Sequence, residues 1–301
     1  MRHLLEIDDL STTELREIVD LAKAPVDSLG RPLDGRGVAC YFSKPSARTR
    51  NSTEMAVVQL GGHPVYITDV EVGMDTRESA EDVTRTLGCY HDVICARVFG
   101  HELLERMVNV DVVPIVNLLS DGAHPLQAIA DVLTIEAECG PIEDQVVVYV
   151  GDSNNVTRSL ALAIGMLGGR MRVASPPGHQ MSSLDRDRLA AAGIEPEFLD
   201  RPEDAVKGAD VVYTDTWVSM GQETEREERV KAFEGFAVDT KLMASGAAAI
   251  FMHCLPAHRN EEVSDAVLDG PQSRIWAQAT NRLHAARAVL HWVHAGNDRS
   301  K

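Results

Sequence analysis

Hydroxyl and guanidinium side chains stand together in the segment Ser46-Ala47-Arg48-Thr49-Arg50, which follows the apolar run Gly37–Phe42. The run is short and β-prone, and the residues after Ser46 place apolar side chains at helical spacing, so we expect a strand, a loop and a helix. Ser46 is expected to cap the helix by accepting a hydrogen bond from a first-turn N–H group. Arg48 and Arg50 would then crowd cations at the positive end of the helix dipole, which is unfavourable unless an anion binds there. The segment therefore predicts a phosphate-like ligand, with a solvated basic turn as the alternative.

Polar side chains also follow two later apolar runs in the first half of the chain. Arg97 ends one of them, and His124-Pro125-Leu126-Gln127 follows the next after a short turn. Because proline suits the first position of a helix, His124 is expected at the helix cap and Gln127 one turn further on. Both side chains would then face the space beyond the edge of the sheet. A histidine that only caps the helix is the alternative for His124.

The second half opens with the apolar run Val146–Val150 and a polar loop that contains Asn154 and Asn155. A dinucleotide-binding loop needs the spacing G-x-G-x-x-G, and this loop has only the first glycine, so nicotinamide chemistry is disfavoured. Paired Asn side chains at a strand end can bind the carboxylate of an amino acid, although Asn-rich turns are common without a ligand.

Two further runs of the second half also end in residues that could bind or react. Asp215 follows one run and precedes Ser219 and Met220 in a loop closed by a glycine, a pattern that can hold an α-ammonium and carboxylate pair. Cys254 follows the other. The alternatives are a helix cap for Asp215 and a packing role for Cys254.

Composition restricts the possible partners. The chain has 301 residues and a formal net charge of -17, so binding to nucleic acid or to an anionic membrane surface is disfavoured, and an anion site must be a local basic pocket. No apolar run approaches the roughly 18 residues of a membrane span, and we expect a cytoplasmic protein. The five cysteines form no C-x-x-C pair, which favours reduced, buried thiols.

The elements that would position these residues alternate between strand-like and helix-like patterns. We expect an α/β fold with two domains, each a mostly parallel sheet flanked by helices. Gly140-Pro141 marks the break between domains 1–138 and 139–282, and a C-terminal helix over 283–301 is expected to pack back on the first. The expected helices are 9–23 with a Ser11–Glu14 capping box, 46–60, 78–88, 101–108 and 125–138, and the expected strands are 37–42, 64–67, 93–96, 112–119, 146–150, 172–174, 211–213 and 249–252.

Taken in order, these motifs resemble the carbamoyltransferase family, which includes the aspartate and ornithine enzymes. Ser46–Arg50 resembles the Ser-x-Arg-Thr-Arg phosphate-binding signature, with Ala47 where Thr is usual. The His-Pro-x-Gln string is similar to the family motif that contacts the carbamoyl group. The segments at Asp215 and Cys254 resemble Asp-x-x-x-Ser-Met-Gly and His-Cys-Leu-Pro of the ornithine branch, and Arg282 resembles a late Arg that reaches carbamoyl phosphate.

The resemblance implies carbamoyl transfer from carbamoyl phosphate to the δ-amine of L-ornithine, giving L-citrulline and phosphate in an arginine-biosynthesis or urea-cycle-type step. It implies no metal and no organic cofactor, and a homotrimer or a multiple of one. The implied catalytic residues are Arg97, His124, Asp215 and Cys254. The implied carbamoyl phosphate-binding residues are Ser46, Ala47, Arg48, Thr49, Arg50, Arg97, His124, Gln127, Cys254, Leu255 and Arg282, and the implied ornithine-binding residues are Asn155, Asp215, Ser219 and Met220.

Two other functions are weighed against this one. A carbamoyltransferase for another amine, such as putrescine, would have no α-carboxylate for Ser219 and Met220 to hold. A noncatalytic amino-acid-binding regulator would not need the residues Arg48, Arg97, His124 and Cys254.

The segment 72–79 departs from the family pattern, because it lacks the Gln that ornithine enzymes usually offer to a neighbouring subunit. We hypothesise that Arg77 reaches the neighbouring phosphate instead, and a solvated loop charge is the alternative.

Overall fold

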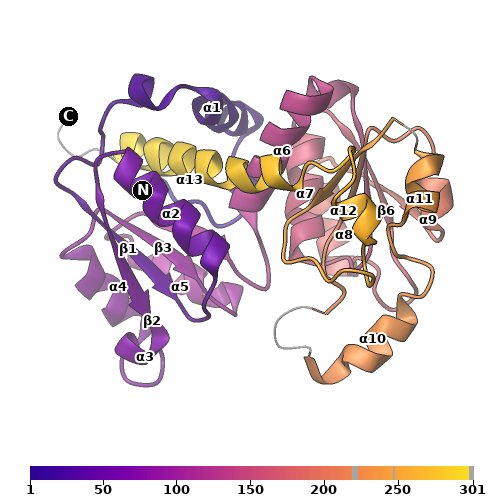
Figure 1. Cartoon of the computed structure of the whole chain (residues 1–301). Coiled ribbons are helices and arrows are strands. Elements are labelled where there is room, and N and C mark those ends of the chain that lie inside the picture. The colour runs from indigo at the N-terminus through magenta and orange to yellow at the C-terminus, as the bar shows by residue number, and fades with distance from the viewer. Residues whose placement is uncertain (219–222, 247, 298–301) are drawn as a thin grey trace. The chain divides into compact units, whose positions relative to one another are not determined.

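The structure, a computed structural model, describes residues 1–218, 223–246 and 248–297. The chain forms two compact units, one of Met1–Ala130 with Asn281–Lys301 and one of Asp131–Thr280. The chain passes from one unit to the other twice, once within helix α6 (Pro125–Cys139) and once within helix α13 (Ile275–Asn297) (Figure 1). In the described part of the chain, no helix has the length and apolar character that a bilayer crossing requires.

The first unit contains a four-stranded sheet in the order β2-β1-β3-β4, and every pair of neighbouring strands is parallel. Its strands are β1 (Gly37–Phe42), β2 (His63–Thr68), β3 (Val93–Arg97) and β4 (Ile115–Leu119). Its further helices are η1 (Ile7–Asp9), α1 (Thr12–Lys23), η2 (Val26–Leu29), α2 (Ala47–Gln59), α3 (Asp69–Val72), α4 (Ala80–Gly88) and α5 (His101–Val110).

Local sequence signals explain several of these elements. Ser11 accepts from the Glu14 N–H, and Glu14 accepts from the Ser11 N–H, so the expected capping box begins α1. All five residues of β3 are buried, as an apolar strand covered on both faces requires. Helix α13, yellow in Figure 1, lies beside α1 and α2, where Arg287 donates to Gln59 and to the carbonyl of Ala22.

The second unit contains a five-stranded parallel sheet in the order β7-β6-β5-β8-β9. Its strands are β5 (Val146–Val150), β6 (Arg170–Ala174), β7 (Glu197–Leu199), β8 (Val211–Thr214) and β9 (Ile250–His253). Its further helices are η3 (Ile142–Asp144), α7 (Asn155–Met166), α8 (Ser183–Ala191), α9 (Pro202–Ala205), η4 (Glu223–Glu225), α10 (Arg226–Ala232), α11 (Thr240–Ser245) and α12 (Asp265–Leu268).

Each sheet has one point where the strand order reverses. In the first sheet the chain adds β2 on one side of β1 and β3 on the other, and in the second it adds β6 on one side of β5 and β8 on the other. Ligands of open α/β sheets bind at such points, beyond the carboxyl ends of the two central strands. We therefore expect ligand-binding residues directly after β1 and β3 in the first sheet, and directly after β5 and β8 in the second.

The α/β fold with two parallel-sheet units is confirmed, and several expected elements need correction. The first helix begins at Thr12, because the residues before it form η1 with its own Glu6–Asp9 capping box. The short helix α3 after β2 was not expected, and β4 begins at Ile115 and not at residue 112. Strand β7 was not expected, since three residues give too short a pattern to detect.

Candidate active site

The side chain of Thr49 is the meeting point of the polar residues in the first unit. Its Oγ1 accepts from Arg97 Nη1 at 3.3 Å and from Arg282 Nη2 at 3.2 Å, and it lies 3.1 Å from the Ser46 hydroxyl. Arg282 Nη1 also donates to Gln127 Oε1 at 2.5 Å. Thr49, Arg97, Gln127 and Arg282 are all buried. Residues from β3, α2, α6 and α13 are thereby brought together at the reversal point of the first sheet.

His124 adds a neutral imidazole to this cluster. Burial, reinforced by the positive charges of Arg282 and Arg97, places the pKa of His124 well below its usual value. At neutral pH the ring is therefore uncharged and carries one N–H. Two buried guanidiniums that depress the pKa of a nearby histidine indicate a positive potential, which favours an anionic ligand.

The strand ends hold this arrangement in place. The carbonyl of Arg97 accepts from the Ser43 N–H at 2.9 Å and from the Ser43 hydroxyl at 3.0 Å, so the loop after β1 is tied to the end of β3. In the sheet register Phe42 lies beside Arg97. The start of α2 is consequently fixed relative to the Arg97 side chain.

The predicted hydrogen bond from a first-turn N–H of α2 to Ser46 is wrong. Ser46 does occupy the N-cap position, but its side chain makes no capping bond, and its hydroxyl is hydrogen-bonded instead to the hydroxyl of Thr49. The Arg50 N–H bonds to the Ser46 carbonyl, as in any first turn. Since no side chain in the described residues caps α2, its first N–H groups can serve as donors to an anion.

The two arginines of the first turn differ in their contacts. Arg50 donates from Nε to Glu54 at 2.8 Å, and its guanidinium lies 3.7 Å from the ring centroid of Tyr66. Arg48 is exposed, as is Ala47. The structure therefore joins Thr49, Arg97, Gln127, His124 and Arg282 electrostatically or by hydrogen bonds, whereas Arg50 is directed to Glu54 and Tyr66.

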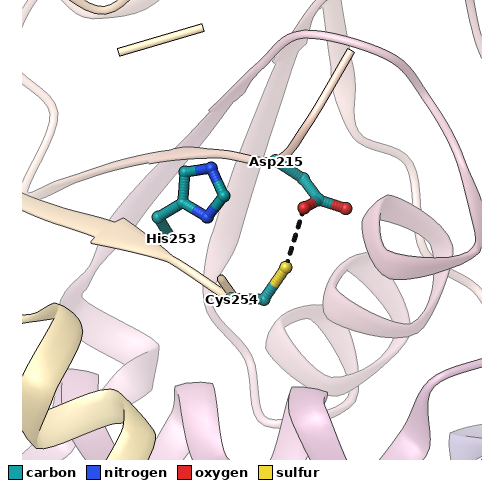
Figure 2. Close-up of side chains that lie close together, drawn as sticks. All are labelled: Asp215, His253 and Cys254. Atoms are coloured by element: carbon teal, nitrogen blue, oxygen red, sulfur yellow. Dashed lines mark hydrogen bonds between the residues drawn. The ribbon is translucent and has the colours of Figure 1, made fainter. Parts of the chain in front are cut away.

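In the second unit, Asp215 and Cys254 lie at the carboxyl ends of the neighbouring strands β8 and β9. The Cys254 thiol donates to Asp215 Oδ1 at 2.9 Å (Figure 2). Asn154 Nδ2 lies 3.4 Å from Asp215 Oδ2. Figure 2 shows the sulfur directed at the carboxylate, with the His253 ring beside the pair. Asp215 is buried, and Cys254 and Asn154 are half-buried. A buried carboxylate at the end of a strand can bind an ammonium group.

Asn155 is the first residue of α7, and the Asn154 side chain caps that helix by accepting from the N–H groups of Val156 and Thr157. The capping role explains Asn154, the first residue of the pair. Ser219 and Met220 lie outside the described residues. Arg77 is exposed and donates to the carbonyl of Glu71 at 3.2 Å, within its own loop.

A buried polar network behind Cys254 was missed from the sequence. The Gln278 side chain accepts from the His253 N–H at 2.9 Å, and its amide donates to Asp131 at 2.7 Å and to Tyr213 at 3.1 Å. His253 Nε2 lies 3.2 Å from Glu262. The residues of this network are distant in sequence. The one signal in the sequence is a polar residue, such as Asp131, at a helix position where an apolar residue is expected.

The residue after Cys254 has an unusual backbone. Leu255 has φ of 61°, in the left-handed region that a branched side chain rarely adopts, and the Leu255–Pro256 peptide is cis. The Leu255 N–H donates to His253 Nδ1 at 2.9 Å, which fixes Nδ1 as an acceptor and leaves the ring proton on Nε2, toward Glu262. The histidine therefore supports the turn that carries Cys254.

Asp215, His253 and Cys254 each offer a possible metal-ligand atom, and these atoms lie within 4.8 Å of one another. Both ring nitrogens of His253 are already engaged by Leu255 and Glu262. A metal ion could use this imidazole only by displacing one of those bonds.

The chain matches two family models that together cover most of its length. Residues 2–137 match the aspartate/ornithine carbamoyltransferase carbamoyl-P binding domain, and residues 143–293 match the Asp/Orn binding domain of the same family. An ornithine carbamoyltransferase from Haloquadratum walsbyi is 44% identical over 292 residues, covering 96% of each chain.

Relatives from a second organism agree in sequence and in structure. The anabolic ornithine carbamoyltransferase of Pyrococcus furiosus is 44% identical over 305 residues, covering 98% of this chain and 97% of the relative. A solved structure of ornithine carbamoyltransferase from that organism has a TM-score of 0.92 at 43% identity, with 98% of this chain and 97% of the other covered.

Proposed function

Because this chain belongs to the aspartate/ornithine carbamoyltransferase family, we propose that it transfers the carbamoyl group of carbamoyl phosphate to the δ-amine of L-ornithine, producing L-citrulline and phosphate. The observation that carries this proposal is the convergence of two buried guanidiniums, from Arg97 and Arg282, on the hydroxyl of Thr49. Such a cluster has the charge and the donors to hold a phosphorylated carbonyl compound.

In this proposal the first unit binds carbamoyl phosphate. The first-turn N–H groups of α2 and the side chains of Ser46, Arg48, Thr49 and Arg50 hold the phosphate, with Arg282 beside them. Arg97, Thr49 and the N–H of neutral His124 donate to the carbonyl oxygen, and Gln127 accepts from the carbamoyl amide. As the amine attacks, negative charge develops on that oxygen, where fixed donors stabilise it more than in the ground state.

The second unit binds L-ornithine. Asp215 attracts the α-ammonium group, Asn155 contacts the substrate, and Ser219 with the Met220 backbone completes the grip on the α-amino and carboxylate groups. Cys254 lies beside the δ-amine, with Leu255 next to it in the turn that also contacts carbamoyl phosphate. The δ-amine attacks as the neutral base to form the C–N bond, and collapse of the tetrahedral intermediate breaks the C–O bond to phosphate, which departs with the proton that the amine loses.

The residues invoked can do this chemistry by positioning and electrostatics alone. The proposed division of roles follows residues 1–138 for carbamoyl phosphate and 139–282 for ornithine, except that Arg282 joins the carbamoyl phosphate site. We also propose a homotrimeric, cytoplasmic enzyme, which size-exclusion chromatography with light scattering would test for assembly.

An assay of citrulline release tests the activity against its alternatives. With carbamoyl phosphate present, the chain should form citrulline from L-ornithine, and it should not carbamoylate putrescine or L-aspartate at comparable rates. Preference for putrescine would identify a carbamoyltransferase for another amine. Ornithine binding in calorimetry without product would identify a noncatalytic regulator and overturn the proposed activity.

A further inference from the structure

One buried arginine of the second unit contacts both strand-end turns of the proposed ornithine site. Arg229, on α10, is 7% exposed. Its Nε donates to the carbonyl of Trp217 at 2.6 Å, and its Nη2 donates to the carboxylate of Asp152. Trp217 lies two residues after Asp215, and Asp152 lies two residues before Asn154. A single guanidinium thereby links the turn after β5 to the loop after β8.

The surroundings make this link rigid. Trp217 is buried and stacks on Phe233 with ring centroids 5.2 Å apart and an interplanar angle of 17°. Asp152 lies 3.5 Å from His179, and its backbone carbonyl accepts from the Thr157 hydroxyl at the start of α7. Burial raises the pKa of the Asp152 carboxyl, and the charge of Arg229 opposes that shift.

The Thr214 hydroxyl donates to the Val150 carbonyl at 2.6 Å where β5 and β8 end, but the ladder of the sheet does not extend into the two turns. That ladder pairs Val147 with Val211 and Tyr149 with Tyr213, and the pairing ends before residues 151–155 and 215–217 begin. Beyond the ladder, Asn154 Nδ2 and Asp215 Oδ2 are 3.4 Å apart, which is long for a hydrogen bond. The two charge-assisted bonds of Arg229 are shorter and are buried, so they contribute more to holding the turns together.

We propose that Arg229, held by Asp152, is a positioning residue that determines amino-acid binding by setting the separation of the Asn154–Asn155 turn and the Asp215 loop. This inference rests on the proposed function, since it gives those turns the task of binding ornithine. The planar fork of arginine is required, because it reaches two acceptors in different directions. A lysine ammonium can reach one of them well but not both.

Kinetics with both substrates separate positioning from a general structural role. Arg229→Lys should raise KM for L-ornithine by about 10-fold or more, as expected for the loss of one buried charge-assisted bond, and leave KM for carbamoyl phosphate within about twofold. Asp152→Asn should show the same selectivity. If the pair acts as a unit, the double variant should be little worse than the poorer single variant.

Arg172 provides a matched control in the same unit. It also binds one carboxylate, that of Glu197, and two backbone carbonyls, those of Ala205 and Lys207, yet it touches neither turn. Arg172→Lys should therefore lower the melting temperature without a selective change in KM for ornithine. Hydrogen exchange should increase over residues 151–157 and 215–218 in Arg229→Lys, and not over 170–174.

The outcomes distinguish this inference from the proposed function. An unaltered chain that forms no citrulline would overturn both the activity and the substrate role of Arg229. Activity in the unaltered chain combined with an unchanged ornithine KM in Arg229→Lys would overturn only the positioning role. Equal increases in both KM values, or the same ornithine effect in Arg172→Lys, would also reject it in favour of a general loss of structure.

Discussion

The thiol of Cys254 donates a hydrogen bond to Oδ1 of Asp215 across 2.9 Å. The sheet register explains the pairing, because β8 and β9 are neighbours and Thr214 lies beside His253, so the next residue of each strand is brought to the same edge. In this bond the thiol is the donor and the carboxylate oxygen is the acceptor. Cys254 and Asp215, neither of which indicates chemistry by itself, thus form a donor and acceptor pair.

Replacement of Cys254 tests whether this pair acts on substrate. Cys254→Ser keeps a donor for Asp215 but shortens its reach, so we expect an intact fold, lower turnover or weaker ornithine affinity, and an altered pH profile of kcat/KM. Steady-state kinetics from pH 6 to 9 and thermal unfolding measure both effects. Cys89→Ser, at an exposed thiol, is the control and should change neither. Unchanged kinetics with a lower melting temperature would make Cys254 a packing residue.

The sequence was sufficient to predict the parts of the site that depend on local pattern. Arg97 and the Ser46–Arg50 segment follow strands whose apolar runs are plain, and parallel strands bring their carboxyl ends to one edge. That rule predicts from the sequence alone that these residues lie close together. The meeting of Arg97 with Thr49, and of Asp215 with Cys254, follows from it.

What the sequence could not predict are the partners chosen by tertiary packing. The Ser46 hydroxyl could either cap α2 or bond to a nearby side chain, and the position of the Thr49 hydroxyl favours the second. Arg229 and Asp152 are separated by 77 positions, and Gln278 and Asp131 by 147, with no local pattern to link either pair. Buried polar networks of this kind are specified by the complete fold.

The buried, neutral state of His124 predicts a pH dependence of stability. Its pKa in the folded state is lowered, so as the pH falls below about 6.5 the unfolded chain takes up a proton that the folded chain does not. Stability therefore decreases on acidification through that window. His124→Gln should reduce the slope of unfolding free energy against pH by up to about 1.4 kcal/mol per pH unit.

Urea unfolding at several values from pH 5 to 7.5 measures this slope. His124→Gln should keep part of the dependence of unfolding free energy on pH, because burial also lowers the pKa of His3, His91 and His284. His63→Gln, at an exposed histidine, is the control and should retain the full slope. An identical slope in His124→Gln and the unaltered chain would contradict a neutral, buried His124.

The exposed position of Arg48 predicts loss of ligand binding without loss of the fold. Arg48→Ala should weaken carbamoyl phosphate binding by about 10- to 100-fold, the effect of removing a hydrogen bond to a charged group, and leave the melting temperature nearly unchanged. Isothermal titration calorimetry measures the affinity. Arg85→Ala removes another exposed arginine of the first unit, one paired with Asp82, and should bind normally. Unchanged affinity in Arg48→Ala would remove this residue from the phosphate site.

The loop that carries Arg77 is anchored at its base and exposed at its tip. Arg106 holds Asp75 through two hydrogen bonds of 2.6 and 2.9 Å and also binds Glu81. Arg77 itself is exposed, with its guanidinium on the Glu71 carbonyl. A firm base with an exposed cation suits a contact to a neighbouring subunit, and we predict that Arg77 reaches the phosphate bound there.

Mixed assembly tests this shared site. Arg48→Ala and Arg77→Ala should each be nearly inactive alone, but a reassembled equal mixture should regain about a quarter of the sites, those that combine an intact Arg48 from one chain with an intact Arg77 from the next. Denaturation and renaturation of the mixture, followed by the citrulline assay, measures the recovery. A mixture of Arg48→Ala with Arg97→Ala is the control and should regain nothing, because both residues belong to the same unit of one chain. If Arg77→Ala is fully active alone, or if its mixture with Arg48→Ala recovers no activity, Arg77 is an ordinary surface charge of its own loop.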